Sequence, residues 1–320
     1  MNSIAILCSG GDVSGMNPAI KHFVEYALAK DLKPYLIYDG YDGLIDGDIH
    51  EAYFSSVSGI INRGGTILRS KRSSRFLDPS YRAKAKANLA KLGIDKLVVL
   101  GGDGSFRGMS AFCAEHNISF CGVPSTIDND IVGTEYSLGV DTALNVIRSA
   151  IDNIRDTASS FSRAFVIETM GRDCGYLALI SALTSGAELC LIPEVEYDLI
   201  HYKQKFAQEL KNGRRYFIAV VSEGIKDSSQ SIAKWFEDEV GIEARVTTLG
   251  HTQRGGSPTT YDRLMAYRFV THAIDALLSK DGANSVICYN SGGFNYKDIE
   301  TIAKSKFELS SELLGYLRYV

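Results

Sequence analysis

The chain has 320 residues, of which 45% are hydrophobic and 22% are charged, and its formal net charge is −4. This composition is that of an ordinary soluble globular protein with length for about two domains. The slightly negative charge provides no broad positive field for nucleic acid or acidic lipid, so we expect small molecules or further copies of the chain as partners. We predict neither a membrane span nor a secretory signal, and therefore a cytoplasmic location, because no apolar run approaches ~18 residues and "MNSIAILCSGG" lacks a basic start.

The predicted elements alternate along the chain. Short runs rich in Ile, Val and Leu predict strands, and longer stretches with apolar positions at helical spacing predict amphipathic helices between them. The strands are predicted at residues 3–9, 34–40, 96–102, 119–125, 163–169, 188–194, 216–224 and 285–290, and the clearest helices at Pro18 to Ala29, Asp141 to Ile154 and Tyr261 to Leu278. Strands buried on both faces that alternate with helices indicate an α/β protein with mainly parallel sheets.

The six cysteines are expected to be buried and reduced. None forms a CxxC pair, and several lie inside apolar runs such as "ELCLIP" and "SVICYN". A disulfide framework or a zinc site does not fit this distribution in a chain of this length.

Glycine and polar residues follow five of the predicted strands. They form the stretches "CSGGDVSGMN" (8–17), "LGGDGSFRG" (100–108), "PSTIDND" (124–130), "ETMGRDCG" (168–175) and "VSEG" (221–224). Ligands of parallel α/β sheets collect beyond the carboxyl ends of the strands, so these stretches can converge on one site.

Two of the stretches have the composition of phosphate-binding turns. The glycines of "SGGDVSGMN" would let backbone amides approach an anion at a helix N-terminus, although a tight strand-to-helix turn explains them equally well. Asp103 in "GGDGS" could hold a hard cation that bridges phosphate oxygens, or could simply cap the next helix.

Asp128 and Asp130 of "TIDND" form a pair of carboxylates. In an extended backbone they point to one side, with Asn129 facing away. Such a pair could serve phosphoryl transfer, one carboxylate near a metal and the other accepting the proton of the attacking hydroxyl. An Asx-type turn is the purely structural alternative.

Several basic residues stand in glycine-rich or strand-end surroundings and could bind phosphate. Converging guanidinium groups would neutralise the charge of a sugar phosphate, whereas a single arginine is most often a solvated surface group. The candidates are Arg72, Arg163, Arg172, Arg245, His251 and Arg254.

As an ordered set, the motifs resemble the bacterial 6-phosphofructokinase family. The set comprises "SGGDVSGMN", "INRGGT" (61–66), "GGDGS" (101–105), "TIDND" (126–130), "MGR" (170–172), "PE" (193–194), "SEG" (222–224) and "LGHTQRGGSPTTYDR" (249–263), and it spans nearly the whole chain. The resemblance implies transfer of the γ-phosphoryl group of MgATP to the 1-hydroxyl of fructose 6-phosphate, with Mg²⁺ as cofactor.

The resemblance also implies a fold and an assembly. It implies two Rossmann-like α/β lobes with the active site in the cleft between them: a larger ATP-binding lobe of residues 1–138 plus about 251–301, and a smaller sugar-phosphate-binding lobe of residues 139–250 plus about 302–320. A homotetramer built as a dimer of dimers is implied as well.

Site residues are carried over from the family motif by motif. Asp128 matches the catalytic base, and Thr126 and Arg172 match groups that hold the transferred phosphoryl. The ATP side is matched by Gly11, Arg72, Gly102, Asp103, Gly104 and Ser105, and the metal by Asp103 and Asp130. The sugar-phosphate side is matched by Thr126, Asp128, Asp130, Arg163, Met170, Gly171, Arg172, Glu223, Arg245, His251 and Arg254, with Arg163 and Arg245 implied to reach a neighbouring subunit's site.

Some positions of the chain that differ within the family affect the choice of phosphoryl donor. Diphosphate-dependent relatives carry Asp and Lys where this chain has Gly104 and Ser125, so these two residues favour ATP. Arg107 and Leu77 stand where many bacterial members have Met and Arg, which affects the adenine side. A diphosphate-dependent enzyme and a non-catalytic sugar-phosphate or nucleotide sensor are the alternative functions.

The effector site implied by the family departs further. Lys21, Glu25 and Phe54 replace family residues there, whereas Arg155, Glu188 and Arg214 remain in register. We expect activation by ADP and inhibition by phosphoenolpyruvate to be blunted or absent, because guanidinium groups have been lost and a carboxylate added.

Overall fold

The computed structural model describes residues 2–279, 284–305 and 307–320. The chain forms two compact units. Unit 1 consists of Met1–Thr142 and Arg254–Phe307, and unit 2 of Ala143–Gln253 and Glu308–Val320.

A seven-stranded sheet forms the centre of unit 1. Its order is β11-β10-β5-β4-β1-β2-β3, and β10, β5, β4, β1 and β2 are parallel, whereas β3 and β11 pair antiparallel at the two edges. The strands are β1 (Ser3–Cys8), β2 (Lys33–Ile37), β3 (Ile49–Glu51), β4 (Ile94–Gly101), β5 (Ser119–Pro124), β10 (Ser285–Asn290) and β11 (Gly293–Asp298).

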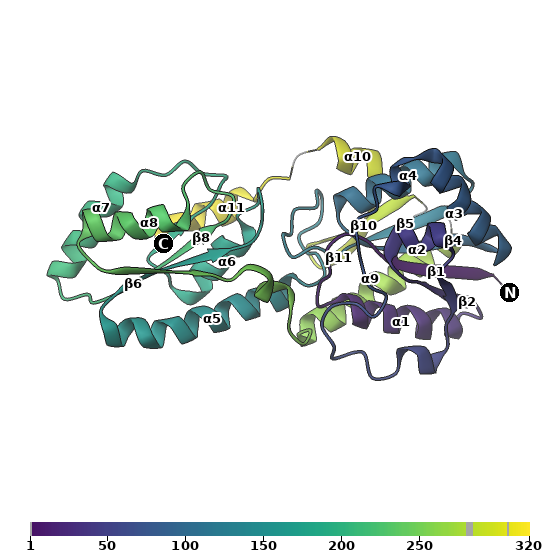
Figure 1. Ribbon diagram of the computed structural model, residues 1–320, viewed down its shortest axis with the longest axis horizontal. Helices are drawn as coiled ribbons and strands as arrows, with labels where there is room; N and C mark the ends of the chain where they lie inside the picture. The colour runs from purple at the N-terminus through teal and green to yellow at the C-terminus, as the bar shows by residue number, and fades with distance from the viewer. Residues whose placement is uncertain (1, 280–283, 306) are drawn as a thin grey trace. The chain divides into compact units, whose positions relative to one another are not determined.

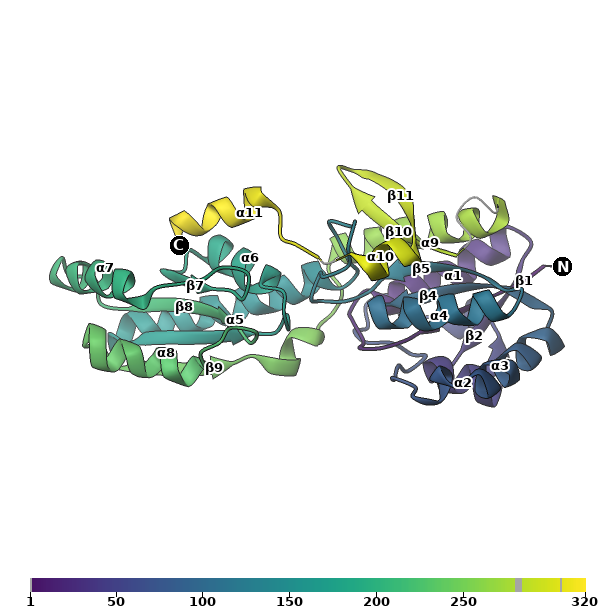
Figure 2. The same cartoon turned by 90° about the horizontal axis from the view of Figure 1, so that it is seen from above.

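Helices cover both faces of this sheet (Figures 1 and 2). Helices α1 and α9 pack together on one face, and α2, α3 and α4 lie on the other, where their apolar side chains join one core with alternate residues of β1, β2 and β4. The helices are α1 (Met16–Ala29), α2 (Gly40–Asp46), α3 (Pro79–Lys91), α4 (Asp103–Glu115), α9 (Thr260–Ser279) and α10 (Ile299–Lys304), with short 3₁₀ turns η1 (Phe54–Val57) and η2 (Arg75–Leu77).

Unit 2 contains an all-parallel sheet of four strands in the order β7-β8-β6-β9. Helices α7 and α8 cover one face, and α5 lies on the other side (Figure 1). The strands are β6 (Ala164–Thr169), β7 (Leu189–Leu191), β8 (Phe217–Ser222) and β9 (Ala244–Thr248). The helical elements are α5 (Val140–Phe161), α6 (Tyr176–Ser185), α7 (Leu199–Lys211), α8 (Ser229–Trp235), η3 (Phe236–Val240), η4 (Gly250–Arg254), α11 (Ser311–Gly315) and η5 (Tyr316–Tyr319).

The predicted α/β class is confirmed, and every predicted strand and helix is present, some with shifted ends. The central strands read as continuous apolar runs because both of their faces are buried; all six residues of β1 and of β8 are buried. The sequence analysis missed β3, β9 and β11. They lie at sheet edges, and β11 has mostly exposed, polar residues, so the apolar signal of a strand is absent.

The six cysteines are free, and all except the half-buried Cys113 are buried. Burial raises the pKa of Cys8, Cys113 and Cys121 to about 12, which keeps these thiols protonated at neutral pH. In the part of the chain that the structure describes, no helix combines the length and apolarity needed to cross a membrane.

Candidate active site

Three of the five predicted polar stretches come together in unit 1. They follow β1, β4 and β5, which are parallel neighbours in the sheet, so all three begin at the carboxyl ends of adjacent strands. The other two follow β6 and β8, which are parallel neighbours in unit 2. The structure thus groups the candidates by sheet, three stretches in one unit and two in the other.

The turn after β1 organises two distant loops. The Oγ atom of Ser14 donates to the carbonyl oxygen of Gly256 at 3.0 Å, and the amide of Asn17 donates to the carbonyls of Arg63 and Gly64 at 3.0 and 3.1 Å. The side-chain Oδ1 atom of Asn17 also accepts the backbone N–H of Ile67 at 2.8 Å. The motif that precedes α1 therefore fixes "INRGGT" and the "QRGGSP" loop.

Gly11 faces Arg254 directly. A Cβ atom at Gly11 would lie 2.6 Å from the Nη1 atom of Arg254, and that nitrogen donates to the carbonyl of Asp12 at 3.3 Å. A methyl group at residue 11 would have to displace the flexible end of Arg254, so glycine permits the close approach. The sequence analysis placed these two residues on different sides of the reaction, yet they are in contact.

The turn after β4 places Asp103 at the first position of α4, with Gly102 as the N-cap. The guanidinium of Arg107 holds Asp103, with 2.7 Å from Nη2 to Oδ2 and 3.1 Å from Nε to Oδ1. A Cβ atom built at Gly104 meets no described atom within 4 Å. The N-terminal turn of α4 thus presents open space beside a carboxylate and backbone N–H groups, an arrangement that suits phosphate.

The segment after β5 is a turn rather than extended chain. Asn129 has a φ of +52°, and the hydroxyl of Thr126 accepts the backbone N–H of Asp128 at 3.2 Å. The side-by-side placement of Asp128 and Asp130 expected from an extended backbone is therefore wrong, and the turn alternative describes the local backbone. Asp128 is 2% exposed and Asp130 is half-buried, so the turn gives the two carboxylates different surroundings.

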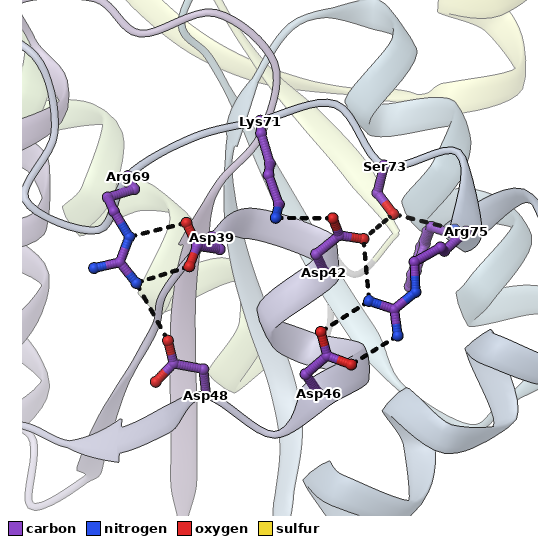
Figure 3. A network of polar contacts seen from close by, with 9 residues as sticks. Asp39, Asp42, Asp46, Asp48, Arg69, Lys71, Ser73 and Arg75 are labelled. Atoms are coloured by element: carbon purple, nitrogen blue, oxygen red, sulfur yellow. Dashed lines mark hydrogen bonds and ion pairs between the residues drawn. The ribbon is translucent and has the colours of Figure 1, made fainter.

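Arg72 lies in an anchored segment of unit 1. Its neighbours from Arg69 to Arg75 are paired with aspartates on and around α2 (Figure 3). Arg72 itself is exposed, and it forms no hydrogen bond or ion pair with the described residues. Its guanidinium is thus available to a ligand.

In unit 2, Glu223 organises the turn after β6. Its Oε1 atom accepts the backbone N–H groups of Gly171 and Arg172 at 3.2 and 3.0 Å. Gly171 has a φ of +138°, and a Cβ atom there would lie 2.2 Å from the carbonyl of Cys174, so only glycine fits. The backbone N–H of Met170 donates to Gln253 at 3.2 Å, which ties the turn to η4, where the exposed His251 lies.

Arg163 and Arg245 share one carboxylate. The Nε atom of Arg163 lies 2.7 Å from Oε2 of Glu243, and Arg245 bonds Oε1 of the same side chain. The register of β6 and β9 explains the pairing: Ala164 and Ala244 are partners, so Arg163 and Glu243, which precede them, lie opposite each other. Two guanidinium groups over one carboxylate leave a net positive charge for an anion.

The predicted effector residues divide between the units. In unit 1, Lys21 and Glu25 form an ion pair one helical turn apart on α1. In unit 2, Arg214 bonds Glu188 at 2.6 Å, and Arg155 donates to the carbonyls of Ser185 and Gly186 at the end of α6.

The carboxylates of unit 1 fit Mg²⁺ held together with a phosphate ligand. Within the described residues, no three His, Cys, Asp or Glu side chains form a metal cluster. Mg²⁺ is commonly bound by one or two carboxylates, waters and substrate phosphates, and this donor set matches Asp103 on a phosphate-suited helix terminus. The Arg107 guanidinium already provides a cation to that carboxylate.

Some supporting residues could not have been found from the sequence. Ser14, Asn17 and Glu243 act through partners that are distant along the chain or on another strand, and each has an ordinary polar side chain. The position of Ser14 and Asn17 inside a glycine-rich motif was the available signal.

Comparison with known proteins identifies the family. The family model described as phosphofructokinase matches residues 3–277. The chain belongs to the phosphofructokinase family. The ATP-dependent 6-phosphofructokinase of Sulfurimonas denitrificans is 68% identical over 99% of this chain and 99% of its own length, and that of Sulfurovum sp. is 61% identical over 98% of this chain and 96% of its own length.

A solved phosphofructokinase shows the same fold. The phosphofructokinase of Saccharomyces cerevisiae superposes with a TM-score of 0.88 at 31% identity and covers 95% of this chain. This chain spans 45% of that yeast chain.

Proposed function

We propose that this chain is an ATP-dependent 6-phosphofructokinase, which transfers the γ-phosphoryl group of ATP to the 1-hydroxyl of fructose 6-phosphate in glycolysis. The observation that carries the proposal is the high identity, over almost the full length, to relatives that bear this name. The site geometry supports it, because glycine turns, Asp103 and Asp128 all follow adjacent strands of one sheet.

Asp128 is assigned as the general base. Its side chain is 2% exposed, and the Thr126 turn holds its backbone. A fixed carboxylate that is largely withdrawn from water can accept the proton of the 1-hydroxyl as the oxygen attacks phosphorus. We assign Thr126 and Arg172 to hold the transferred phosphoryl group, whose charge spreads over its equatorial oxygens.

The nucleotide phosphates are assigned to Gly11, Arg72 and the N-terminal turn of α4 from Gly102 to Ser105. Asp103 would hold Mg²⁺, with Asp130 contributing through the metal's water shell. When bound, Mg²⁺ would neutralise negative charge on the nucleotide phosphates.

The sugar phosphate is assigned to residues of unit 2 together with Arg254. Glu223 fixes the backbone of Gly171 and Arg172 and so presents the Arg172 side chain. The set comprises Met170, Gly171, Arg172, Glu223, His251 and Arg254, with Arg163 and Arg245 assigned to a neighbouring subunit's site.

The donor is proposed to be ATP rather than diphosphate. A Cβ atom at Gly104 meets no described atom within 4 Å, so no side chain fills the space beside Asp103. Ser125 is buried, uncharged and already donates its hydroxyl to the carbonyl of Val123 at 3.0 Å, so it provides no cation for diphosphate. The test is formation of fructose 1,6-bisphosphate from fructose 6-phosphate and Mg²⁺ with either donor. Turnover with ATP supports the proposal, turnover with diphosphate alone contradicts the choice of donor, and no turnover with either indicates a sensor.

We also propose a homotetramer in the cytoplasm with weak effector control. Lys21 is already neutralised by Glu25, which supports a weakened polyphosphate site. Light scattering after size exclusion tests the assembly. Sigmoidal fructose 6-phosphate kinetics that micromolar ADP makes hyperbolic would contradict the expected loss of regulation.

A further inference from the structure

Helix α2 contacts three of the loops assigned to ATP. A Cβ atom at its first residue, Gly40, would lie 2.8 Å from the carbonyl of Cys8 at the end of β1. The hydroxyl of Tyr41 donates to the carbonyl of Ser105 in the first turn of α4. Asp42, the third residue, contacts the segment that carries Arg72. The sequence analysis assigned no role to this helix.

The carboxylate of Asp42 contacts both residues that flank Arg72 in the sequence. Its Oδ2 atom lies 3.0 Å from the ammonium of Lys71, and its Oδ1 atom accepts from the hydroxyl of Ser73 (Figure 3). Ser73 in turn accepts the backbone N–H of Phe76 at 3.3 Å. One carboxylate therefore restrains the chain on both sides of Arg72.

Further contacts anchor the same segment at its ends. The guanidinium of Arg69 forms a two-pronged contact with Asp39 at 2.7 and 2.9 Å, and Arg75 forms one with Asp46 at 2.7 and 2.8 Å (Figure 3). Ser70 adds a hydrogen bond of 2.8 Å to the carbonyl of Gly10, which lies in the first ATP loop. The segment 69–75 is thus connected to that loop and to the region of α2.

The ion pairs with aspartates involve most, but not all, of the cations in segment 69–75. Four cations lie between residues 69 and 75, and three of them, Arg69, Lys71 and Arg75, are held by aspartates. The fourth, Arg72, forms no such pair with the described residues. A phosphate group that approaches this segment therefore meets a single uncommitted guanidinium on a restrained backbone.

Asp42 differs from the other aspartates by its burial. Its side chain is 16% exposed, compared with 33% for Asp39 and 58% for Asp46. Burial acts to raise its pKa, but the Ser73 hydroxyl and the Lys71 ammonium outweigh burial, so the pKa of Asp42 lies below its usual value and the group stays ionised at neutral pH. Ion pairs are weaker at exposed positions than at partly buried ones.

We propose that Asp42 is a positioning residue for ATP, which acts through Arg72: it fixes Lys71 and Ser73 so that the Arg72 guanidinium is presented to the nucleotide phosphates. This inference rests on the proposed function, which assigns Arg72 to those phosphates. Asp42 itself need not touch ATP. Positioning of a charged group is worth a large factor because small displacements weaken a charge-assisted contact strongly.

The test compares Asp42→Asn with the matched variant Asp46→Asn on the same helix, in the full-length protein. We expect Asp42→Asn to raise the KM for ATP about tenfold, with less than about a twofold change in the KM for fructose 6-phosphate. Asp46→Asn removes a more exposed carboxylate, which pairs with Arg75 at the end of segment 69–75. This variant should change the KM for ATP and the KM for fructose 6-phosphate by less than about twofold. Melting temperatures of both variants report on folding.

A double-mutant cycle with Arg72→Ala separates positioning from general stability. If Asp42 acts through Arg72, Asp42→Asn should have less than about a twofold effect on kcat/KM for ATP once Arg72 is alanine. An undiminished effect in that background, or equal effects of Asp42→Asn and Asp46→Asn, would overturn the inference while the proposed function stands. If the unaltered chain forms no fructose 1,6-bisphosphate with ATP, the proposed function and this inference fail together.

Discussion

Two clusters of charged side chains, one in each unit, are paired in different ways. In unit 1, aspartates pair with three of the four cations of segment 69–75, and the charges serve to hold backbone. In unit 2, Arg163 and Arg245 share the single carboxylate of Glu243, so positive charge is left over. The difference teaches that the carboxylates of the unit 1 cluster are numerous enough to pair most of its cations, whereas the single carboxylate of the unit 2 cluster leaves one positive charge uncompensated.

The most severe way to test this comparison is to remove the proposed base from unit 1. Asp128→Asn should lower kcat about 10²- to 10⁴-fold, because the amide cannot accept the hydroxyl proton. The KM values should change little, which steady-state kinetics with each substrate will show, and circular dichroism will confirm folding. Retention of more than about a tenth of the turnover would exclude Asp128 as the base.

A charge placed in the open space of unit 1 should also be costly. Gly104→Asp should reduce kcat/KM for ATP on the order of 10²-fold, because its carboxylate would face the nucleotide phosphates beside Asp103. Gly104→Ala is the matched control and should keep most of the activity, because its Cβ atom meets no described neighbour within 4 Å. Equal losses in both variants would show that space, and not charge, is decisive.

The excess charge of unit 2 can be tested separately. Arg245→Ala should raise the KM for fructose 6-phosphate about tenfold while the KM for ATP stays within about twofold, because a charge-assisted contact to the sugar phosphate is lost. Glu243→Gln is the informative partner variant, since it releases both guanidinium groups and should lower the same KM. A rise in the KM for ATP as large as that for the sugar would contradict the division of labour between the units.

The smallest expected effect concerns Arg107, whose guanidinium already pairs with the carboxylate of Asp103. Arg107→Met should lower the Mg²⁺ concentration that gives half-maximal rate by about two- to fivefold, because Arg107 no longer competes for the carboxylate. Arg148→Met removes an ion pair of the same spacing, with Asp152 on α5, and serves as the control. The idea is refuted if both variants show the same Mg²⁺ dependence.

Most of the fold could be predicted from the sequence because buried strands and amphipathic helices have strong patterns. The edge strands β3, β9 and β11 could not, because their residues are partly exposed and their pairing depends on neighbours. The strand-end stretches were found through glycine and aspartate. Their shapes were not: the left-handed backbone at Asn129 changes the arrangement of Asp128 and Asp130, and a residue type alone does not specify it.

The roles of α2 and of Glu243 show the same limit. Asp42, Asp39 and Asp46 look like scattered surface charges in the sequence, and their partners lie about 30 residues further along the chain. Such contacts are set by tertiary packing, so they produce no periodic pattern in the sequence. The family resemblance supplied the assigned functional residues but not the groups that support them.

The hydrogen bonds of Ser14 have a consequence for biosynthesis. The loop after β1 is among the first parts of the chain to leave the ribosome, yet the acceptors within reach of the Ser14 hydroxyl are the carbonyls of residues 254 to 256, that of Gly256 being nearest at 3.0 Å. At the usual pace of translation, those acceptors follow roughly 10 to 50 s later. The nascent protein therefore carries the loop after β1 without this contact through most of its synthesis, and a prematurely terminated chain that lacks residue 256 never gains the nearest acceptor.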